Sequence, residues 1–324
     1  MSQSVKPRSA TFSPSILIRN QHLQTIVPSL YRRDGTQLLA ASQPVILTTS
    51  DGVRLQGFYT PQPGSSKGLV LLLHGWLGCT ESRYNLTLGQ HLFQRGYTVF
   101  RLNYRDHGET HQLNPGLFRG DLLDEVFDAA RQVARLAPEL PFHVVGASLG
   151  GSFALRIAWR HKYNPIPTLQ HVIAVNPAVN PHQATLALDR NPIYLRYFRK
   201  RWRISLQKKQ QLFPDRYHFG PEIYSGSCMA MTEAIMSRYS PHPNALSYFN
   251  SYRVRPEMMV GLTNPVTLLT AADDPIIPVK DLQAFQEVSK LLRVLIVPHG
   301  GHVGYFTLPL RFWLTEFVES VLAE

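Results

Sequence analysis

Short apolar runs alternate with segments of helical periodicity from about residue 44 to the end of the chain. Six of the runs lack polar alternation, as expected of strands that are buried on both faces of a sheet; they are residues 69–73, 97–102, 142–145, 172–175, 266–269 and 294–297. Two further runs, 45–47 and 55–59, lie on either side of Asp51-Gly52 and predict an antiparallel hairpin.

Helical spacing of apolar residues separates several of these runs. It is found at Leu122, Val126, Ala130 and Val133, again at Leu282, Phe285, Val288 and Leu292, and residues 307–322 predict a closing helix. Alternation of strands and helices is typical of an α/β fold, in which helices cover both faces of a mostly parallel sheet.

One interval interrupts the alternation. About ninety residues separate the predicted strand 172–175 from the strand 266–269, too many for a structureless loop in a compact domain. We therefore predict residues 181–262 to be a mainly helical lid insertion. Residues 44–180 and 263–324 then form the core, and residues 1–43 form an irregular arm packed on the body.

Composition narrows the class of protein. Charged residues make up 17% of the 324 residues, and the two cysteines cannot build a disulfide framework. The longest purely aliphatic run has five residues, against the ~20 that a membrane-spanning helix needs. Residues 16–18 are too short for the apolar region of a secretory signal. We expect a soluble, cytoplasmic protein.

The formal net charge of +11 is concentrated in two segments. Residues 1–33 carry Lys6, Arg8, Arg19, Arg32 and Arg33 without an acid, and residues 190–209 carry eight basic residues without an acid. The remaining residues are therefore close to neutral. This distribution argues against a generally basic nucleic-acid binder and predicts either two solvated faces or two patches that contact something anionic.

Residues 146–151 read Gly-Ala-Ser-Leu-Gly-Gly and follow the predicted strand 142–145 directly, with a helical segment after them. A serine on such a turn is exposed above the sheet, and the N-terminus of the helix directs amide groups at it. Small residues are needed on both sides because the backbones of strand and helix approach closely. We predict Ser148 as a nucleophile, with Gly146 and Gly150 as the glycines of the turn.

A serine hydroxyl needs a base and an orienting acid to act as a nucleophile. The predicted strand 266–269 runs into AADDPIIP (271–278), and the carboxyl ends of parallel strands face the ligand crevice of such folds. We prefer Asp274 over Asp273 as the acid and interpret Asp273 as a turn or capping residue.

The base is expected one strand later. The strand 294–297 is followed by PHGGHVGY (298–305), where the paired glycines leave the loop free to bring an imidazole to the serine. His302 is the predicted base, because His299 lies too near the end of the strand.

An oxyanion hole requires two amide donors beside the nucleophile. The loop after the strand 69–73 reads HGWLG (74–78) and lies where the second donor is expected. We predict the backbone N–H groups of Trp76 and Leu149 as donors, each worth ~10²–10³ in rate. His74 is interpreted as a residue that braces the loop. This chemistry requires neither a metal nor an organic cofactor.

Two other clusters carry chemistry-bearing side chains. Asp106, His107, Glu109 and His111 lie within six residues but have no distant partner visible in the sequence, which disfavours a metal site. Residues 194–202 mix basic and aromatic side chains, a pattern that suits single-stranded nucleic acid or a lid helix on an anionic lipid surface. Packing of the lid with solvated arginines is the simpler interpretation.

The turn at Ser148 together with HGWLG, AADDPIIP and HGGHVGY resembles the α/β-hydrolase superfamily. RNQHLQT (19–25) is similar to the Asn-x-His-x-Gln-Thr signature of its YheT-like branch. The resemblance implies an eight-stranded sheet, a helical lid, and a triad of Ser148, Asp274 and His302. The chain departs from the branch at NYRDHG (103–108), where the branch reads Asn-x-Arg-Gly and a small residue, and at Ser152, where the branch often has Asn.

Members of the branch with assigned activity are mostly esterases or lipases. We therefore hypothesise a serine hydrolase of carboxylic esters, whose apolar acyl chain would contact the aromatic and methionine side chains of residues 181–262 unless these form the insertion's own core. Thioester hydrolysis or acyl transfer would use the same groups, and a non-catalytic lipid- or partner-binding module is the second hypothesis. Peripheral contact with an anionic membrane is also expected; a nucleic-acid partner is not.

Overall fold

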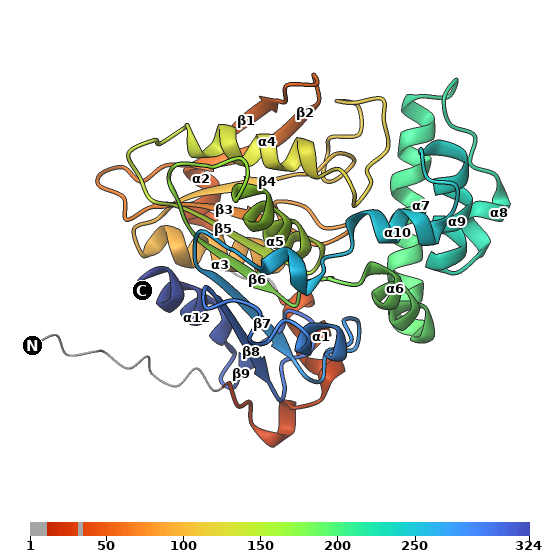
Figure 1. Cartoon of the computed structure of the whole chain (residues 1–324). Helices are drawn as coiled ribbons and strands as arrows, with labels where there is room; N and C mark the ends of the chain where they lie inside the picture. The colour runs from red at the N-terminus through yellow and green to blue at the C-terminus, as the bar shows by residue number, and fades with distance from the viewer. Residues whose placement is uncertain (1–11, 32–34) are drawn as a thin grey trace, which may run out of the picture.

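The computed structural model describes residues 12–31 and 35–324, and its centre is an eight-stranded sheet with the order β1-β2-β4-β3-β5-β6-β7-β8 (Figure 1). β1 and β2 form the predicted antiparallel hairpin, β2 pairs antiparallel with β4, and every other pairing is parallel. The mostly parallel α/β class is therefore confirmed. The strands are β1 (Gln43–Thr48), β2 (Arg54–Thr60), β3 (Leu69–Leu73), β4 (Thr98–Leu102), β5 (Phe142–Ala147), β6 (Leu169–Val175), β7 (Val266–Ala271) and β8 (Leu292–Val297).

Helices cover both faces of the sheet (Figure 1). α4 (Leu123–Ala134) and α5 (Leu149–His161) pack on one face, and α3 (Arg83–Gln94) and α12 (Trp313–Leu322) pack on the other. The side chains of β3 alternate between the hydrophobic cores on the two faces of the sheet. Leu69, Leu71 and Leu73 belong to the core on the side of α4 and α5, and Val70 and Leu72 belong to the core on the side of α3 and α12. A strand buried on both faces has no solvent side on which a polar residue could lie.

Residues 181–262, here called the cap, form helices that group at one side of the sheet (Figure 1). They are α6 (Pro181–Arg190), α7 (Pro192–Leu212), α8 (Pro221–Ser225), α9 (Cys228–Tyr239) and α10 (Ala245–Tyr252). The 3-10 helix η2 (Pro256–Met259), at the end of the cap, contacts α5 instead. The side chains of Asn180, Asn191 and Asn244 accept backbone amides at the starts of α6, α7 and α10, as N-cap residues do. Across the described ranges, no helix is long and apolar enough to cross a membrane.

In its described residues, 12–31 and 35–43, the N-terminal arm is largely helical, which corrects the expectation of an irregular segment. It contains η1 (Ile16–Ile18), α1 (Gln21–Leu30) and α2 (Thr36–Ala40). The Asn20 side chain accepts the amides of His22 and Leu23 and so satisfies the free start of α1. Among the basic residues expected in this segment, Lys6, Arg8, Arg32 and Arg33 lie outside the described residues.

Two predicted helices are also corrected. The apolar spacing over 282–292 gives only the single turn α11 (Lys280–Gln283), because the chain turns at Glu287 with φ +62° and Leu292 already begins β8. The closing helix starts at Trp313 instead of residue 307. Pro309 lacks the amide hydrogen that a helix needs, and the chain forms the short hairpin of β9 (Phe306–Thr307) and β10 (Arg311–Phe312).

Candidate active site

Ser148 lies at the junction of β5 and α5 with φ +56° and ψ −118°, a conformation that is rare for any residue with a side chain. Its surroundings hold it there. The Ser148 amide donates to the carbonyl of Val175 at 2.9 Å, and the Ser148 carbonyl accepts the amides of Ser152 and Ala178 at 3.0 and 3.1 Å. Strain of this kind persists only where neighbouring structure enforces it, and it is concentrated at functional sites.

The two predicted glycines of the turn are required by close backbone contacts. A Cβ on Gly146 would lie 2.0 Å from the carbonyl oxygen of Gly150, and a Cβ on Gly150 would lie 2.2 Å from that of Leu73. No side chain fits at either position. The glycine spacing therefore follows from how tightly α5 folds back on β5 and β3.

The structure brings Asp274 and His302 into contact. Nδ1 of His302 lies 2.8 Å from Oδ2 of Asp274, whose side chain is fully buried. The other carboxylate oxygen of Asp274 accepts the amides of Ile276 and Ile277 at 2.8 and 3.0 Å. The carboxylate is thereby fixed in position, and it directs the remaining ring nitrogen of His302 away from itself.

The alternative residues Asp273 and His299 are paired with each other instead. Nδ1 of His299 lies 3.4 Å from Oδ2 of Asp273, and Oδ1 of Asp273 accepts the amide of Gly301 at 2.9 Å. Asp273 thus holds the loop on which His302 stands but does not touch His302 itself.

Asn176 is a site residue that the sequence analysis missed. It follows β6, is fully buried, and has φ +44°. Its Nδ2 donates to Oδ2 of Asp274 at 2.6 Å and to the carbonyl of Gly301 at 3.2 Å, while its Oδ1 accepts the hydroxyl of Tyr305 at 2.6 Å. Burial raises the pKa of Tyr305 well above its ordinary value, so that hydroxyl stays protonated and donates. The rule that pointed to Asp274, a polar side chain at the carboxyl end of a parallel strand, also applies to Asn176.

α1 supports the histidine loop from the outside. Oγ1 of Thr25 accepts the amide of His302 at 2.9 Å, and the Gln24 side chain contacts both the amide and the carbonyl of Phe306. A Cβ on Gly301 would lie 2.5 Å from the carbonyl oxygen of Gln21, and one on Gly304 would lie 1.9 Å from that of Gln24. The two motifs therefore pack against each other: RNQHLQT (19–25) at the start of α1 and GGHVGY (300–305) in the His302 loop.

The HGWLG loop passes directly beside Ser148, because a Cβ on Gly75 would lie 3.2 Å from the Cβ of Ser148. The amide of Leu77 donates to Nε2 of His107 at 3.0 Å, and the amide of Gly75 donates to the hydroxyl of Tyr84. Within the described part of the chain, no hydrogen bond uses the amides of Trp76 or Leu149. These two N–H groups are free to bind an oxygen that develops negative charge.

Two buried histidines brace this loop in their neutral form. Burial lowers the pKa of His74 to about 4 and that of His107 well below its ordinary value. Nδ1 of His74 donates to the carbonyl of Gly75 at 2.8 Å, and Nδ1 of His107 donates to that of Arg105 at 2.7 Å. Each ring therefore has an unprotonated Nε2, which accepts a backbone amide.

The other chemistry-bearing side chains near this loop have protein partners. Asp106 pairs with Lys209, Glu109 with Lys208, and Nε2 of His111 lies 2.8 Å from the hydroxyl of Ser205. No group of three or more His, Cys, Asp or Glu side chains in the described ranges is placed to hold a metal ion.

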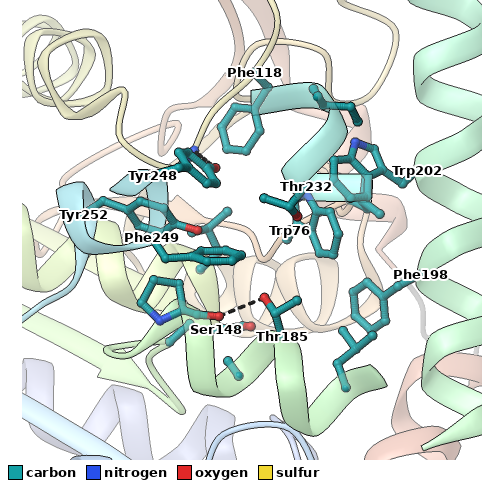
Figure 2. Close-up of a pocket in the computed structure, with 18 of the residues that line it drawn as sticks. Trp76, Phe118, Ser148, Thr185, Phe198, Trp202, Thr232, Tyr248, Phe249 and Tyr252 are labelled. Atoms are coloured by element: carbon teal, nitrogen blue, oxygen red, sulfur yellow. Dashed lines mark hydrogen bonds between the residues drawn. The ribbon is translucent and has the colours of Figure 1, made fainter. Parts of the chain in front are cut away.

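Two hollows meet at Ser148. The first is a mostly apolar cavity of about 120 Å³ between the sheet edge and the cap, lined by Ser148 and Leu149 but not by His302. Figure 2 shows Tyr248, Phe249 and Tyr252 on one side of it and Trp76, Trp202 and Phe198 on the other. The second is a wider groove of about 1030 Å³, lined by Ser148, His302, α1 and α7. Ser148 and His302 thus share the groove, and no hydrogen bond joins their side chains in the described structure.

The chain is similar to a protein-family model, to proteins with assigned names and to solved structures. The model of the alpha/beta hydrolase fold family matches residues 68–309. YheT of Escherichia coli (strain K12), which carries the name of an esterase, is 23% identical over 330 aligned positions, covering 96% of this chain and 95% of YheT. The protein slr0264 of Synechocystis sp., also named as an esterase, is 26% identical over 289 residues, covering 80% of this chain and 76% of slr0264.

Two solved structures share the fold at low identity. The esterase Pf2001 of Pyrococcus furiosus superimposes with a TM-score of 0.57 at 16% identity, covering 90% of this chain and 93% of that one. A soluble variant of the monoglyceride lipase of Saccharomyces cerevisiae gives a TM-score of 0.59 at 16% identity, covering 91% of this chain and 98% of that one. At such identities the likeness shows a common fold.

Proposed function

The chain belongs to the α/β-hydrolase fold family, and from that premise we propose that it hydrolyses carboxylic esters through Ser148, His302 and Asp274. The observation that carries the proposal is the 2.8 Å contact between His302 and a buried carboxylate, in a groove that also contains the strained Ser148. The relatives named as esterases support the ester class of substrate.

In the proposed reaction, His302 takes the proton of the Ser148 hydroxyl as its oxygen attacks the acyl carbon. Asp274 keeps Nδ1 of the ring protonated and stabilises the imidazolium. The negative oxygen of the tetrahedral intermediate binds the amides of Trp76 and Leu149. Collapse breaks the ester bond, the leaving alcohol takes the proton from His302, and Ser148 retains the acyl group. Water then repeats the sequence, releasing the carboxylic acid.

The serine and the imidazole need to approach each other only when substrate is bound. Hydrogen bonds of catalytic groups are often long in an empty site and tighten in the complex. Gly300 and Gly301, with φ +156° and +55°, give the loop of His302 conformations that other residues rarely adopt.

The two hollows suit the two halves of an ester. The leaving alcohol must receive its proton from His302, so it occupies the groove that His302 lines. The acyl chain then occupies the apolar cavity, which lacks His302. A cavity of about 120 Å³ is roughly ten times the space that a single water-sized sphere needs, so it accommodates an apolar chain of several carbons.

A matched pair of variants tests the triad. We expect a fluorophosphonate probe to label the wild type but not Ser148→Ala. Asp274→Asn should lower kcat/KM for a p-nitrophenyl ester by about 10⁴-fold, whereas Asp273→Asn, which alters a neighbouring carboxylate without contact to His302, should lower it by far less. Equal losses in both variants would contradict the assignment, and absence of labelling in the folded wild type would favour a binding module.

Acyl esters of increasing length test the assignment of the cavity. Each buried methylene is worth about 0.8 kcal/mol, or roughly fourfold in kcat/KM, until the cavity is full. Ala184 lines the cavity and is buried, so Ala184→Leu should shift the optimum to shorter chains and leave acetyl esters nearly unaffected. The same loss for all chain lengths would show that the acyl chain binds elsewhere.

Contact with a membrane is a separate proposal, because it rests on the exposed residues of α7 and not on the cavity.

A further inference from the structure

α7 has an exposed face that combines basic and large apolar residues at helical spacing. This face consists of Ile193, Arg196, Tyr197, Lys200, Arg203 and Ile204. Ile193, Tyr197 and Ile204 are 60%, 52% and 53% exposed. Large apolar side chains in such numbers on the outside of one helix indicate contact with something apolar.

The charge of α7 has one sign. The helix carries seven basic residues and no Asp or Glu, and only Lys208 and Lys209 form ion pairs within the described ranges. The side chains of Arg196, Lys200 and Arg203 are exposed and lack a carboxylate partner there. Apart from residues 1–33, which carry five basic residues and no acid, the rest of the chain is close to neutral, so α7 is the larger of the two concentrations of positive charge.

Apolar side chains also surround the mouth of the groove that contains Ser148. Ile193, Tyr197 and the exposed Arg201 of α7 line it. So do Leu30 of α1 and Leu39 of α2, which are 73% and 43% exposed. The exposed face of α7 and the mouth of the groove are therefore continuous through Ile193 and Tyr197.

We propose that this surface, the exposed face of α7 with the rim of the groove, docks on an anionic lipid membrane. A helix lying at a membrane surface inserts apolar side chains among the lipids while Lys and Arg bind anionic headgroups, and α7 has both on one face. Single-stranded nucleic acid fits less well, because it needs a series of aromatic platforms for successive bases, and Tyr197, with the Arg201 guanidinium 5.6 Å from its ring centre, is the one exposed aromatic side chain of α7. Phe198 and Trp202 are turned inward and pack on Trp76, at ring-centre distances of 5.5 and 4.9 Å.

Docking in this orientation would open the groove toward the lipid, so an ester dissolved in the membrane could reach Ser148 without crossing water. Binding itself requires no catalysis. The full-length Ser148→Ala variant should therefore bind vesicles as the wild type does, which separates this proposal from the proposed hydrolysis.

The test is co-sedimentation with vesicles of phosphatidylcholine, with and without phosphatidylserine. Each basic residue at an anionic surface strengthens binding by roughly fivefold, so Arg196→Gln/Lys200→Gln/Arg203→Gln should weaken binding to phosphatidylserine vesicles roughly a hundredfold. Ile193→Ser/Ile204→Ser should weaken it with all charges intact. Added salt should weaken binding of the wild type more steeply than binding of the charge variant, which retains Arg199 and Arg201.

A matched control removes the same charge from another place. Lys67, Arg135 and Lys290 are exposed and come shortly before β3, β5 and β8, at the sheet edge opposite to Ser148. Their triple Gln variant should bind within about twofold of the wild type. Equal weakening in the two triple variants would show a net-charge effect and overturn the proposal. So would wild-type binding that ignores phosphatidylserine, or retention of the folded wild type on single-stranded RNA but not on vesicles.

Discussion

Lys209 extends from α7 into the body of the protein, and its side chain is 1% exposed. Its Nζ lies 2.6 Å from Oδ1 of Asp106, 2.6 Å from the carbonyl oxygen of Asn114 and 3.2 Å from that of His111. Burial raises the pKa of Asp106 and lowers that of Lys209. Each charge therefore persists because the other is present, and the pair joins the cap to the loop after β4.

Lys209→Met should destabilise the protein strongly. Removing one member of a buried ion pair leaves an uncompensated charge and costs about 3–5 kcal/mol. Asp106→Asn/Lys209→Met should recover a large part of this loss, because no charge is then left buried. The neighbouring Lys208→Met is the control: Lys208 pairs with Glu109 at the surface, with side chains 34% and 87% exposed, and such pairs contribute about 1 kcal/mol or less.

Urea unfolding followed by far-UV circular dichroism and by tryptophan fluorescence measures these differences. One of the four tryptophans, Trp202, lies in the cap and packs on Trp76 of the body, so fluorescence includes a signal from the contact between them. A lower midpoint at constant slope reports lost stability. The reasoning is refuted if Lys209→Met costs no more than Lys208→Met. It is equally refuted if the losses of the two single variants simply add in the double variant, since partners in one ion pair must be coupled.

Two further predictions concern packing and pH. Gly304→Ala would place a Cβ 1.9 Å from the carbonyl oxygen of Gln24. We therefore expect α1 to be displaced from the His302 loop, with a loss of about 1–3 kcal/mol in stability and a loss of ester turnover. Gly64→Ala is the control, because no atom lies within 4 Å of its new Cβ, and it should change neither quantity; equal effects of the two variants would contradict this prediction. Burial lowers the pKa of His143 from 6.5 to about 4. As the pH falls through this range, His143 binds a proton in the unfolded chain before it does so in the folded protein. The stability of the folded protein should therefore fall, by up to about 3 kcal/mol for this residue. His143→Gln should flatten the pH dependence of the urea midpoint there, and an unchanged slope would count against it.

Local patterns in the sequence were sufficient to predict the sheet and the order of the site motifs. β3 is an uninterrupted apolar run, and β5, β6 and β7 are mostly apolar, because both faces of these strands are covered. Helical spacing was less reliable. It predicted α4 correctly. Over 282–292 it predicted a helix, but the structure has only the single turn α11 followed by a loop, and Leu282 and Phe285 still lie in the core. The spacing of apolar residues indicates which residues are buried. It does not indicate whether the backbone between them stays helical.

Other features depend on contacts between residues that are distant along the chain. The choice of Asp274 over Asp273 as the contact of His302 depends on side-chain directions at the end of β7. The helical arm was missed although α1 has a capped start and apolar residues at helical spacing, because Pro28 and the Ser- and Pro-rich residues before it favour an irregular chain. The position of α1 depends on Gln24 and Thr25 contacting the loop of His302.

The sequence by itself determined which residues are candidates for the proposed chemistry and which strands they follow, because strand burial and glycine-dependent turns are encoded locally. Only the tertiary structure decided which of these groups meet. Asn176 joins Asp274 to the histidine loop, Lys209 ties the cap to Asp106, and the inward turn of Phe198 and Trp202 leaves a basic and apolar face of α7 outside. Each of these contacts joins distant parts of the chain, and no local preference specifies such a pair before the sheet has brought its loops together.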